Sequence, residues 1–442
     1  MNRVALVTVL AWVASAQVVV FENVNVIPMD RERILAARTV LVRDGRIAEI
    51  GPANRVRAPE GAVRVDGRGK YLMPGFAEMH GHLPGPDVPR EVVEDVMFLY
   101  VANGVTTVRG MLGNPIHLQL RREVAEGKLL GPRLYVAGPA FAGAKLTPEE
   151  ARQRVREQKE AGYDLLKVLE GLRPETYEAM AAEAKAVGIP FAGHVPDEVG
   201  LLRCLEVGQK SIDHLDGYLE ALEADDSPLR NADPKIRRRD LGLYLDERKI
   251  PALAEATRKA GAWVVPTMAL WETFNSTESP EAMAQRAELQ FVPRQWVEGW
   301  VKQKTTLLAN LNPEAGRRVI EVRKKVLKAL RDAGVRIAFG TDSPQVFSVP
   351  GFSTHREIPI LREAGLTPYE ILVSGTRHVA EYFGTLAETG TVERGKRADL
   401  ILLEANPLAD PANLARRAGV MVAGRWIPET EIQKRLAAMA SR

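Results

Sequence analysis

The sequence predicts an α/β protein, a (β/α)₈ TIM barrel with a small β-sandwich domain built from both chain ends. Between Pro74 and Gly384, eight short apolar runs alternate with segments of helical period, a pattern typical of such a barrel. On both sides of this region, apolar and polar residues alternate and tight turns recur, as in a small all-β unit. We therefore expect the two chain ends to meet in one sheet structure around the barrel.

The first residues, MNRVALVTVLAWVASAQ, predict a secretory signal peptide over residues 1–16. Arg3 supplies a positive charge, an apolar run follows, and Ala14-Ser15-Ala16 has the small-x-small pattern of a cleavage site. An ordinary buried N-terminal strand is the alternative, whereas a membrane anchor needs an apolar stretch of about 20 residues. We expect a secreted or periplasmic protein that has no membrane attachment once the signal is cleaved.

The β-sandwich is expected to use residues 17–73 and 385–427. The first part alternates in VVVFENVNVIP and TVLVRDGRIAEIGP, and its Asp44-Gly45 dipeptide is a strong signal for a type I′ hairpin. The same alternation returns in GTVERGKRADLILLEANP and GVMVAGRWIP. The last residues, 428–442, are expected to form a C-terminal helix.

The barrel is expected to span residues 74–384. Its apolar runs are, in order, FAEMHGHL, GVTTVRGM, PRLYVAG, DLLKVLE, IPFAGHV, SIDHL, AWVVPTMA and RIAFGTDS. Intervening segments such as PEEARQRVREQKEAGY have helical period and begin with proline or acidic residues. Two connections, 219–250 and 272–312, are unusually long, and connections of that length usually carry lids or specificity elements.

Composition limits the kinds of partner that the chain can have. With 45% hydrophobic and 26% charged residues among 442, it resembles a soluble globular protein, and its net charge of +3 is too small for a nucleic-acid binder. The single cysteine, Cys204, excludes an intrachain disulfide and a cysteine-based zinc site, and its apolar neighbours indicate an inert core residue. We expect a small-molecule substrate as partner, and a homo-oligomer is compatible with the sequence.

The first apolar run ends with two of the seven histidines, His80 and His82, separated by one glycine. A strand has a side-chain period of two, so both imidazoles point to the same face. Two nitrogen ligands of one metal ion, each about 2 Å from it, need this arrangement. A His-x-His pair alone is a weak signal, and a polar loop pair is the alternative.

Other apolar runs carry polar residues near their carboxyl ends: Lys167 in the fourth run, His194 in the fifth, His214 in the sixth and Asp342 in the eighth. Taken singly, these residues have ordinary explanations, such as a hydrogen-bonded core histidine, a capped turn at Asp342 or a rim lysine at Lys167. The carboxyl ends of all barrel strands face one mouth, however, so we expect these side chains to converge there with His80 and His82.

The motifs that contain these residues resemble those of a known protein family. MPGFAEMHGHL resembles the entry motif of the amidohydrolase superfamily, and FAGHVP, SIDHLDGY and FGTDS resemble its later metal motifs. The tail GTVERGKRADLILLEANPL is similar to the closing segment of the flanking β-sandwich in imidazolonepropionase-like and Xaa-Pro dipeptidase-like members. The resemblance covers nearly the whole chain after the leader and is specific for the superfamily, but not for a substrate.

The resemblance implies a set of metal ligands. It implies that His80 and His82 bind one divalent ion, that His194 and His214 bind a second, and that Asp342 is also a ligand. Lys167 matches the lysine that family members carry as a carbamate bridging both ions. Zinc is the expected metal, although manganese, cobalt or iron would suit the same ligands.

Electrostatics agree with a carbamate at Lys167. Two dications would strongly repel an ammonium group a few ångströms away, so the side chain must be neutral, turned away or converted to an anion. Two Zn²⁺ ions, one carbamate, one Asp342 carboxylate and one hydroxide sum to a formal charge of +1, which partly buried ligands tolerate. A lysine that faces a helix or the rim is the alternative.

The expected reaction is hydrolysis of the C–N amide bond of a small substrate that bears a carboxylate, such as a dipeptide or an N-acyl amino acid. A hydroxide bridging the two ions would attack the carbonyl, and Asp342 would shuttle the proton to the departing nitrogen. Three residues are expected to contact the substrate: Arg109 as a carboxylate clamp, Tyr218 as a donor to the carbonyl oxygen, and His355 near the mouth. A structural ion pair, a packed rim tyrosine and a helix cap are the respective alternatives.

Two other functions stay open. The first is a mononuclear deaminase or cyclic-amide hydrolase, whose members often carry a glutamate three residues beyond the fifth-strand histidine. Asp197 occupies that position here, with Glu198 next, and this departure together with Lys167 favours the two-metal hydrolase. The second is a non-catalytic metal-binding scaffold, because a protein can keep a fold after it has lost the catalytic activity. Metal content and turnover discriminate among the three.

Overall fold

We describe the protein from a computed structural model, whose described residues are 18–441. The predicted signal peptide, residues 1–16, lies outside them. Within the described part, no helix is both long and apolar enough to cross a membrane.

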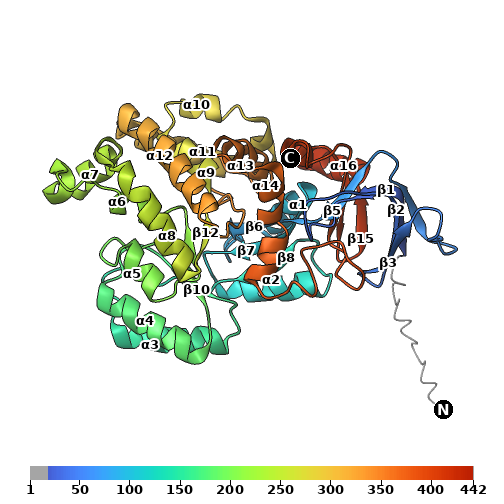
Figure 1. The fold of residues 1–442 in the computed structure, drawn as a ribbon, viewed down its shortest axis with the longest axis horizontal. Coiled ribbons are helices and arrows are strands. Elements are labelled where there is room, and N and C mark those ends of the chain that lie inside the picture. The colour runs from blue at the N-terminus through green and yellow to red at the C-terminus, as the bar shows by residue number, and fades with distance from the viewer. Residues whose placement is uncertain (1–17, 442) are drawn as a thin grey trace, which may run out of the picture.

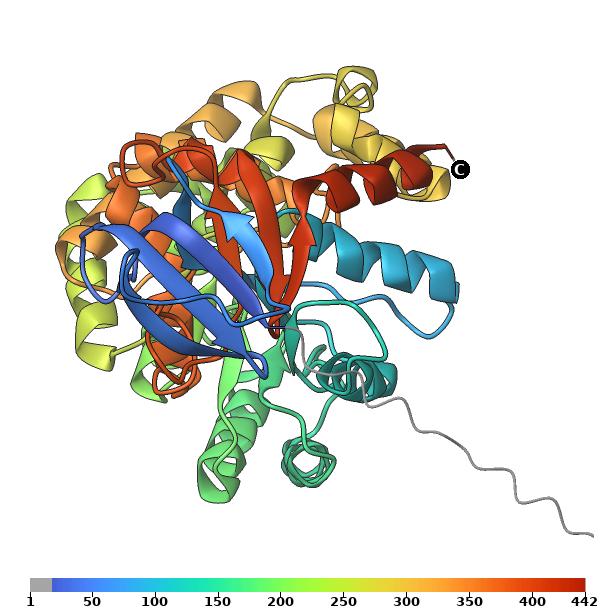
Figure 2. The ribbon, with the colours of Figure 1, turned by 90° about the vertical axis from the view of Figure 1, so that its right-hand side faces the viewer.

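Strands from both ends of the chain form one eight-stranded sheet, as predicted, seen face-on in Figure 2 with early strands in blue beside late strands in red. The order is β15-β14-β13-β5-β1-β2-β3, and β4 also pairs with β1. The strands are β1 (Val19–Val26), β2 (Leu35–Arg43), β3 (Arg46–Pro52), β4 (Val63–Asp66), β5 (Tyr71–Pro74), β13 (Leu400–Leu403), β14 (Arg417–Val422) and β15 (Arg425–Pro428).

The two ends of the chain join where β13 pairs antiparallel with β5. Along one edge, β1 pairs first with β4 and then with β5, so the sheet forks there. The expected two layers are therefore parts of one hydrogen-bonded sheet. The hairpin between β2 and β3 has the predicted turn, because Asp44 and Gly45 both have positive φ values, 52° and 70°.

The middle of the chain forms two parallel sheets. One has the order β6-β7-β8 and the other β12-β11-β10-β9. Their strands are β6 (Phe76–Gly81), β7 (Val105–Gly110), β8 (Arg133–Val136), β9 (Leu166–Val168), β10 (Phe191–Gly193), β11 (Ser211–Asp213) and β12 (Trp263–Val265). These are the first seven predicted apolar runs, each in its predicted place.

The eighth run departs from the prediction. Residues 336–343 form isolated bridges instead of a strand, pairing Ile337 with Val264 and Ser343 with Gly81. Two further bridges, Ala137 with Leu165 and Phe141 with Val168, connect the chain after β8 with the region of β9 and so join the two parallel sheets. A closed barrel ladder is therefore not seen in residues 18–441. Asp342 contributes to the interruption, because its left-handed backbone, with φ 62°, does not fit a regular strand.

Helices surround the parallel sheets, as Figure 1 shows. Those that follow the strands are α1 (Arg90–Ala102), α2 (Pro115–Ala125), α3 (Pro148–Glu160), α4 (Pro174–Val187), α5 (Leu201–Glu206), α8 (Ile250–Ala260), α12 (Pro313–Asp332), α13 (Phe352–Glu363), α14 (Pro368–Ser374) and α15 (Arg377–Tyr382). Local sequence signals fix several of their ends. The helix α3, for example, begins with a capping box between Thr147 and Glu150, and α4 ends at the left-handed Gly188.

The two long connections are largely helical. Region 219–250 contains α7 (Pro234–Asp240) and three short 3₁₀ turns, η1 (Pro228–Asn231), η2 (Leu241–Tyr244) and η3 (Glu247–Lys249), after the short α6 (Tyr218–Ala221). The other begins within α9 (Met268–Asn275) and continues through α10 (Pro280–Met283), η4 (Ala287–Phe291) and α11 (Arg294–Ala309). Near the C-terminus, η5 (Pro411–Ala415) precedes β14, and the predicted final helix is α16 (Glu429–Ala440).

Candidate metal centre

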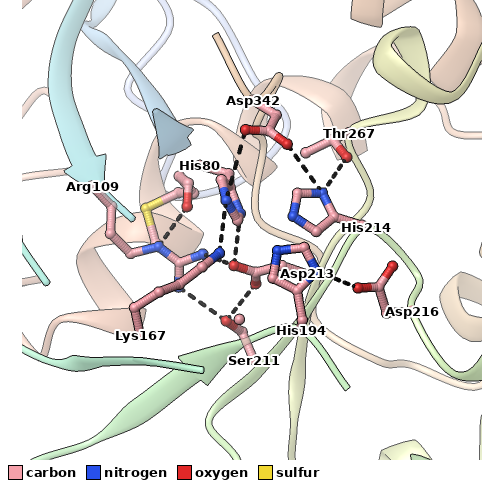
Figure 3. Close-up of polar contacts among 12 residues, drawn as sticks. His80, Arg109, Lys167, His194, Ser211, Asp213, His214, Asp216, Thr267 and Asp342 are labelled. Atoms are coloured by element: carbon pink, nitrogen blue, oxygen red, sulfur yellow. Dashed lines mark hydrogen bonds and ion pairs between the residues drawn. The ribbon is translucent and has the colours of Figure 1, made fainter. Parts of the chain in front are cut away.

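The six residues predicted to gather at the strand ends do so. Nε2 of His80 lies 3.1 Å from Nζ of Lys167, and Nε2 of His82 lies 2.5 Å from Oδ1 of Asp342. The ring of His214 lies 4.2 Å from that of His80 and 4.6 Å from that of His194, centroid to centroid. Figure 3 shows five of the six converging from separate strands and turns. The predicted convergence is confirmed.

The local backbone explains how the side chains reach one point. Lys167 is the middle residue of β9, whereas His194 and His214 directly follow β10 and β11. His214 and Asp342 both adopt the left-handed conformation, with φ of 63° and 62°. This conformation is uncommon outside glycine, and it concentrates at functional sites where the surroundings hold it in place. At His214 it turns the chain immediately after β11.

The histidines are suited to bind metal. Burial lowers the pKa of His80 to about 3 and that of His214 well below its ordinary value, so both imidazoles are neutral. Neutral imidazole is the form that ligates a metal ion. Within residues 18–441, the buried Nε2 of His214 and Nδ1 of His82 have no hydrogen-bond partner. Such atoms are rare in proteins and are commonly explained by a water or an ion that binds them.

Lys167 and Asp342 differ in their response to burial. Burial lowers the pKa of the Lys167 amine to about 8, against the opposing charges of Asp213 and Asp342. An amine with this pKa is partly neutral near pH 8 and can react as a nucleophile. For Asp342, burial opposes ionisation, but contacts with the neighbouring histidines, among them the hydrogen bond with His82, hold its pKa well below the ordinary value. The centre therefore combines neutral imidazoles, one carboxylate and one amine. His80, His214 and Asp342 each offer one ligand atom within 4.8 Å of the others.

Three carboxylates beside the centre were missed by the sequence reasoning. Oδ2 of Asp213 lies 2.8 Å from Nδ1 of His80, and Oδ2 of Asp216 lies 2.7 Å from Nδ1 of His194. The buried Glu78 accepts hydrogen bonds from the backbone N–H groups of His80 and Thr341, both at 2.8 Å. Asp213 and Asp216 flank His214 in SIDHLD, which is the signal that could have found them. Asp213 and Asp216 contact imidazole nitrogens, and carboxylates in such positions orient ligating imidazoles.

Arg109 does not face a substrate, so its predicted role as a carboxylate clamp is wrong. Its side chain is fully buried. The guanidinium donates to Oδ2 of Asp213 at 2.8 Å, to Oγ of Ser211 at 2.9 Å and to the hydroxyl of Tyr382 at 2.8 Å. Arg109 therefore forms the structural ion pair that was its alternative, because the pleat of β7 directs its side chain inward.

The predicted substrate contacts of Tyr218 and His355 are also wrong. Tyr218 is buried, and its hydroxyl lies 2.7 Å from Oγ1 of Thr257 on α8. His355, on α13, has Nε2 at 3.2 Å from Oδ1 of Asn103 and 3.3 Å from Nη1 of Arg417. These side chains pack between helices or against the eight-stranded sheet. Their positions in the chain, after the sixth and eighth apolar runs, do not determine the direction in which the two side chains point.

Known proteins resemble this chain over most of its length. The family model described as "Amidohydrolase family" matches residues 71–427. The chain is 24% identical to an imidazolonepropionase of Rhizobium rhizogenes over 92% of its own length and 95% of that protein. It is 23% identical to an ochratoxinase of Aspergillus niger over 91% of its length and 84% of that protein.

Solved structures share the fold. A Xaa-Pro dipeptidase crystallised with bound methionine superposes with a TM-score of 0.68 at 20% identity, covering 93% of this chain and 100% of that one. A bottromycin amidohydrolase superposes with a TM-score of 0.71 at 24% identity, covering 96% of this chain and 90% of that one. At such identities the likeness shows the fold alone.

Proposed function

Because the chain belongs to the amidohydrolase family, we propose that it is a binuclear metal-dependent hydrolase that cleaves a C–N amide bond of a small substrate. The observation that carries the proposal is the convergence of four histidines, Lys167 and Asp342 on one point, with the buried Nε2 of His214 lacking a hydrogen-bond partner in the described chain. We further propose that the two parallel sheets and residues 336–343 are the parts of the (β/α)₈ barrel typical of this family, which the bridges between them support.

The proposed ligands are the six residues that converge. His80 and His82 would hold one divalent ion, His194 and His214 a second, and Lys167, as a carbamate, would bridge both, with Asp342 completing the set. When bound, such ions polarise a carbonyl and lower the pKa of water to about 7. Zinc suits these nitrogen and oxygen donors best, and the neutral state of His80 and His214 supports the assignment.

Asp342 is the proposed proton shuttle. It lies against His82, at 2.5 Å, and near His80 and His214, so its carboxylate is at the centre of the cluster. From there it would accept a proton from the attacking water and return it to the departing nitrogen, which leaves as a neutral amine. Asp213 and Asp216 would hold the imidazoles of His80 and His194 in their orientations during this cycle.

The proposed substrate is a dipeptide or an N-acyl amino acid. Support comes from the Xaa-Pro dipeptidase structure that shares the fold. Since Arg109 is occupied inside the protein, another group must recognise the substrate carboxylate. The helical connections 219–250 and 272–312 extend from β11 and β12 at the carboxyl ends of these strands, where such a group is expected.

A second candidate is opening of a cyclic amide at a mononuclear centre. The observation that favours it is the match to an imidazolonepropionase over 92% of the chain. An assay of the metal-loaded protein against dipeptides, N-acyl amino acids and cyclic amides, combined with metal analysis, separates the two. Two ions per chain with release of an amino acid supports the first function. One ion per chain with turnover of cyclic amides alone would replace it with the second.

A further inference from the structure

The helix α9 begins beside the candidate metal centre with an unusual N-terminus. Thr267 is its N-cap residue, and threonine at this position normally accepts a hydrogen bond from the first turn of its own helix. In the described structure the Thr267 side chain makes no such bond. Its Oγ1 lies instead 2.8 Å from Nδ1 of His214, as Figure 3 shows. The hydroxyl is thus used by the centre and not by the helix.

A residue from another helix supplies the missing cap. Glu357, on α13, is fully buried. Its Oε1 accepts a hydrogen bond from the backbone N–H of Met268 at 2.8 Å, and its Oε2 accepts one from that of Ala269 at 2.6 Å. The two carboxyl oxygens thus satisfy free N–H groups of the first helical turn, although burial raises the pKa of Glu357 to about 8. Glu357 therefore releases the Thr267 hydroxyl from its usual task.

The backbone of Thr267 is strained, so neighbouring contacts must hold this residue in the conformation that directs its hydroxyl at His214. Its φ of 45° is in the left-handed region, where a β-branched residue is rare. Such a conformation is unfavourable and persists only when neighbouring contacts impose it. The two bonds from Glu357 fix the peptide groups that immediately follow, and Thr267 itself is fully buried. Together these contacts direct Oγ1 at the imidazole.

The hydrogen bond to Thr267 matters because the two nitrogens of an imidazole share one proton. If Nδ1 of His214 carries the proton and donates it to Oγ1, the lone pair is left on Nε2. That atom is the buried nitrogen with no partner among the described residues. A hydrogen bond at one ring nitrogen is the usual way in which proteins select the nitrogen that binds a metal.

We propose that Thr267 and Glu357 are positioning residues of the metal centre: Glu357 caps α9 and thereby holds Thr267 so that its hydroxyl keeps the proton of His214 on Nδ1. The proposal rests on the proposed metal-binding function of His214. Neither residue touches the reacting atoms. Their effect reaches the centre through the orientation and tautomer of a single imidazole.

The first test removes the hydroxyl. In Thr267→Ala we expect the affinity for one of the two zinc ions to fall at least 10-fold, within the 10- to 100-fold range usual for such partners. Thr267→Ser, which keeps the hydroxyl, should restore the affinity to within about 3-fold. The control is Thr257→Ala, because Thr257 is equally buried but its hydroxyl bonds to Tyr218 and the carbonyl of Leu253. Zinc affinity is measured by competition with a chromophoric chelator.

The second readout does not depend on metal. In the metal-free protein with ¹⁵N-labelled histidine, long-range NMR spectra report which ring nitrogen carries the proton, and the His214 signal is assigned by its loss in His214→Gln. We expect the Nδ1–H tautomer in the wild type and a mixture in Thr267→Ala. An unchanged tautomer together with unchanged zinc affinity in Thr267→Ala would overturn the proposal.

Glu357 is tested through its coupling to Thr267. Glu357→Gln should weaken zinc binding in the wild-type background but cause little further loss in Thr267→Ala, because both changes act on the same hydroxyl. Glu223→Gln is the control, a buried glutamate that bonds to Ser227 and Arg237. If the losses of zinc affinity in the two single variants add up fully in the double variant, Glu357 does not act through Thr267, which contradicts the proposal. If the wild type binds no zinc, the proposed function fails, whereas the tautomer spectra still decide the role of Thr267.

Discussion

Arg109 and Asp213 form an ion pair that is closed off from solvent. Nη2 of Arg109 lies 2.8 Å from Oδ2 of Asp213, both side chains are fully buried, and the same oxygen lies 2.8 Å from Nδ1 of His80. The carboxylate that holds His80, a proposed metal ligand, is itself held by a charged partner. Asp213 therefore connects Arg109, inside the parallel sheets, with His80 in the candidate metal centre.

Replacing Arg109 should therefore destabilise the fold. In Arg109→Met we expect the free energy of unfolding to fall by about 3–5 kcal/mol, since the change leaves Asp213 buried without its partner. Urea denaturation of the metal-free protein measures this. The control is Arg121→Met, which removes a partly exposed pair with Asp164 and should cost about 1 kcal/mol or less. If the free energy of unfolding fell equally in the two variants, burial would not be what makes the Arg109–Asp213 pair important for stability.

The same pair predicts how stability depends on pH. Burial alone would raise the pKa of Asp213, but Arg109, with His80 and Lys167, lowers it below the ordinary value. A carboxyl whose pKa is lower in the folded protein stabilises the fold above its unfolded pKa, about 4, and this contribution is lost as the pH falls further. In Asp213→Asn, the free energy of unfolding should consequently fall less steeply below pH 4 than in the wild type, as denaturation at a series of pH values would show.

Asp342→Asn separates metal binding from catalysis. We expect this variant to retain much of its metal, because the four histidines remain, while kcat falls by at least ~10²-fold with loss of the proton shuttle. Metal analysis and steady-state kinetics on a cleaved dipeptide measure the two effects. The matched variant is Asp197→Asn at the acid/base position of the mononuclear alternative, and it should keep its rate. The reverse pattern would favour the alternative mechanism.

Carbon dioxide should control metal uptake through Lys167. The neutral amine, available because burial lowers the pKa of Lys167 to about 8, can form a carbamate. Metal-free protein at pH 8 should recover zinc and activity faster with bicarbonate than in buffer depleted of carbon dioxide. Lys167→Arg, which cannot form a carbamate, should lose this dependence and bind less zinc. If the wild type recovers zinc and activity at the same rate with and without bicarbonate, Lys167 is unmodified.

The sequence alone located the candidate metal centre. His80, Lys167 and His214 could be placed together because each stands on a separate apolar run, and the carboxyl ends of parallel strands meet at one edge. The hairpin at Asp44-Gly45 was equally predictable, since a type I′ turn requires positive φ at adjacent residues. These features depend on local pattern and on general rules of topology.

Only the tertiary structure decided what each neighbouring side chain does. Arg109 and Asp213 are both next to a strand end, yet the packing between strands turns them toward each other and away from a substrate. The contact of Glu357 with the start of α9 joins residues 88 to 89 positions apart, which no local pattern encodes. Side-chain direction and distant hydrogen bonds follow from how whole elements pack. The proposed ligands could therefore be predicted from the sequence, whereas the groups that hold them could not.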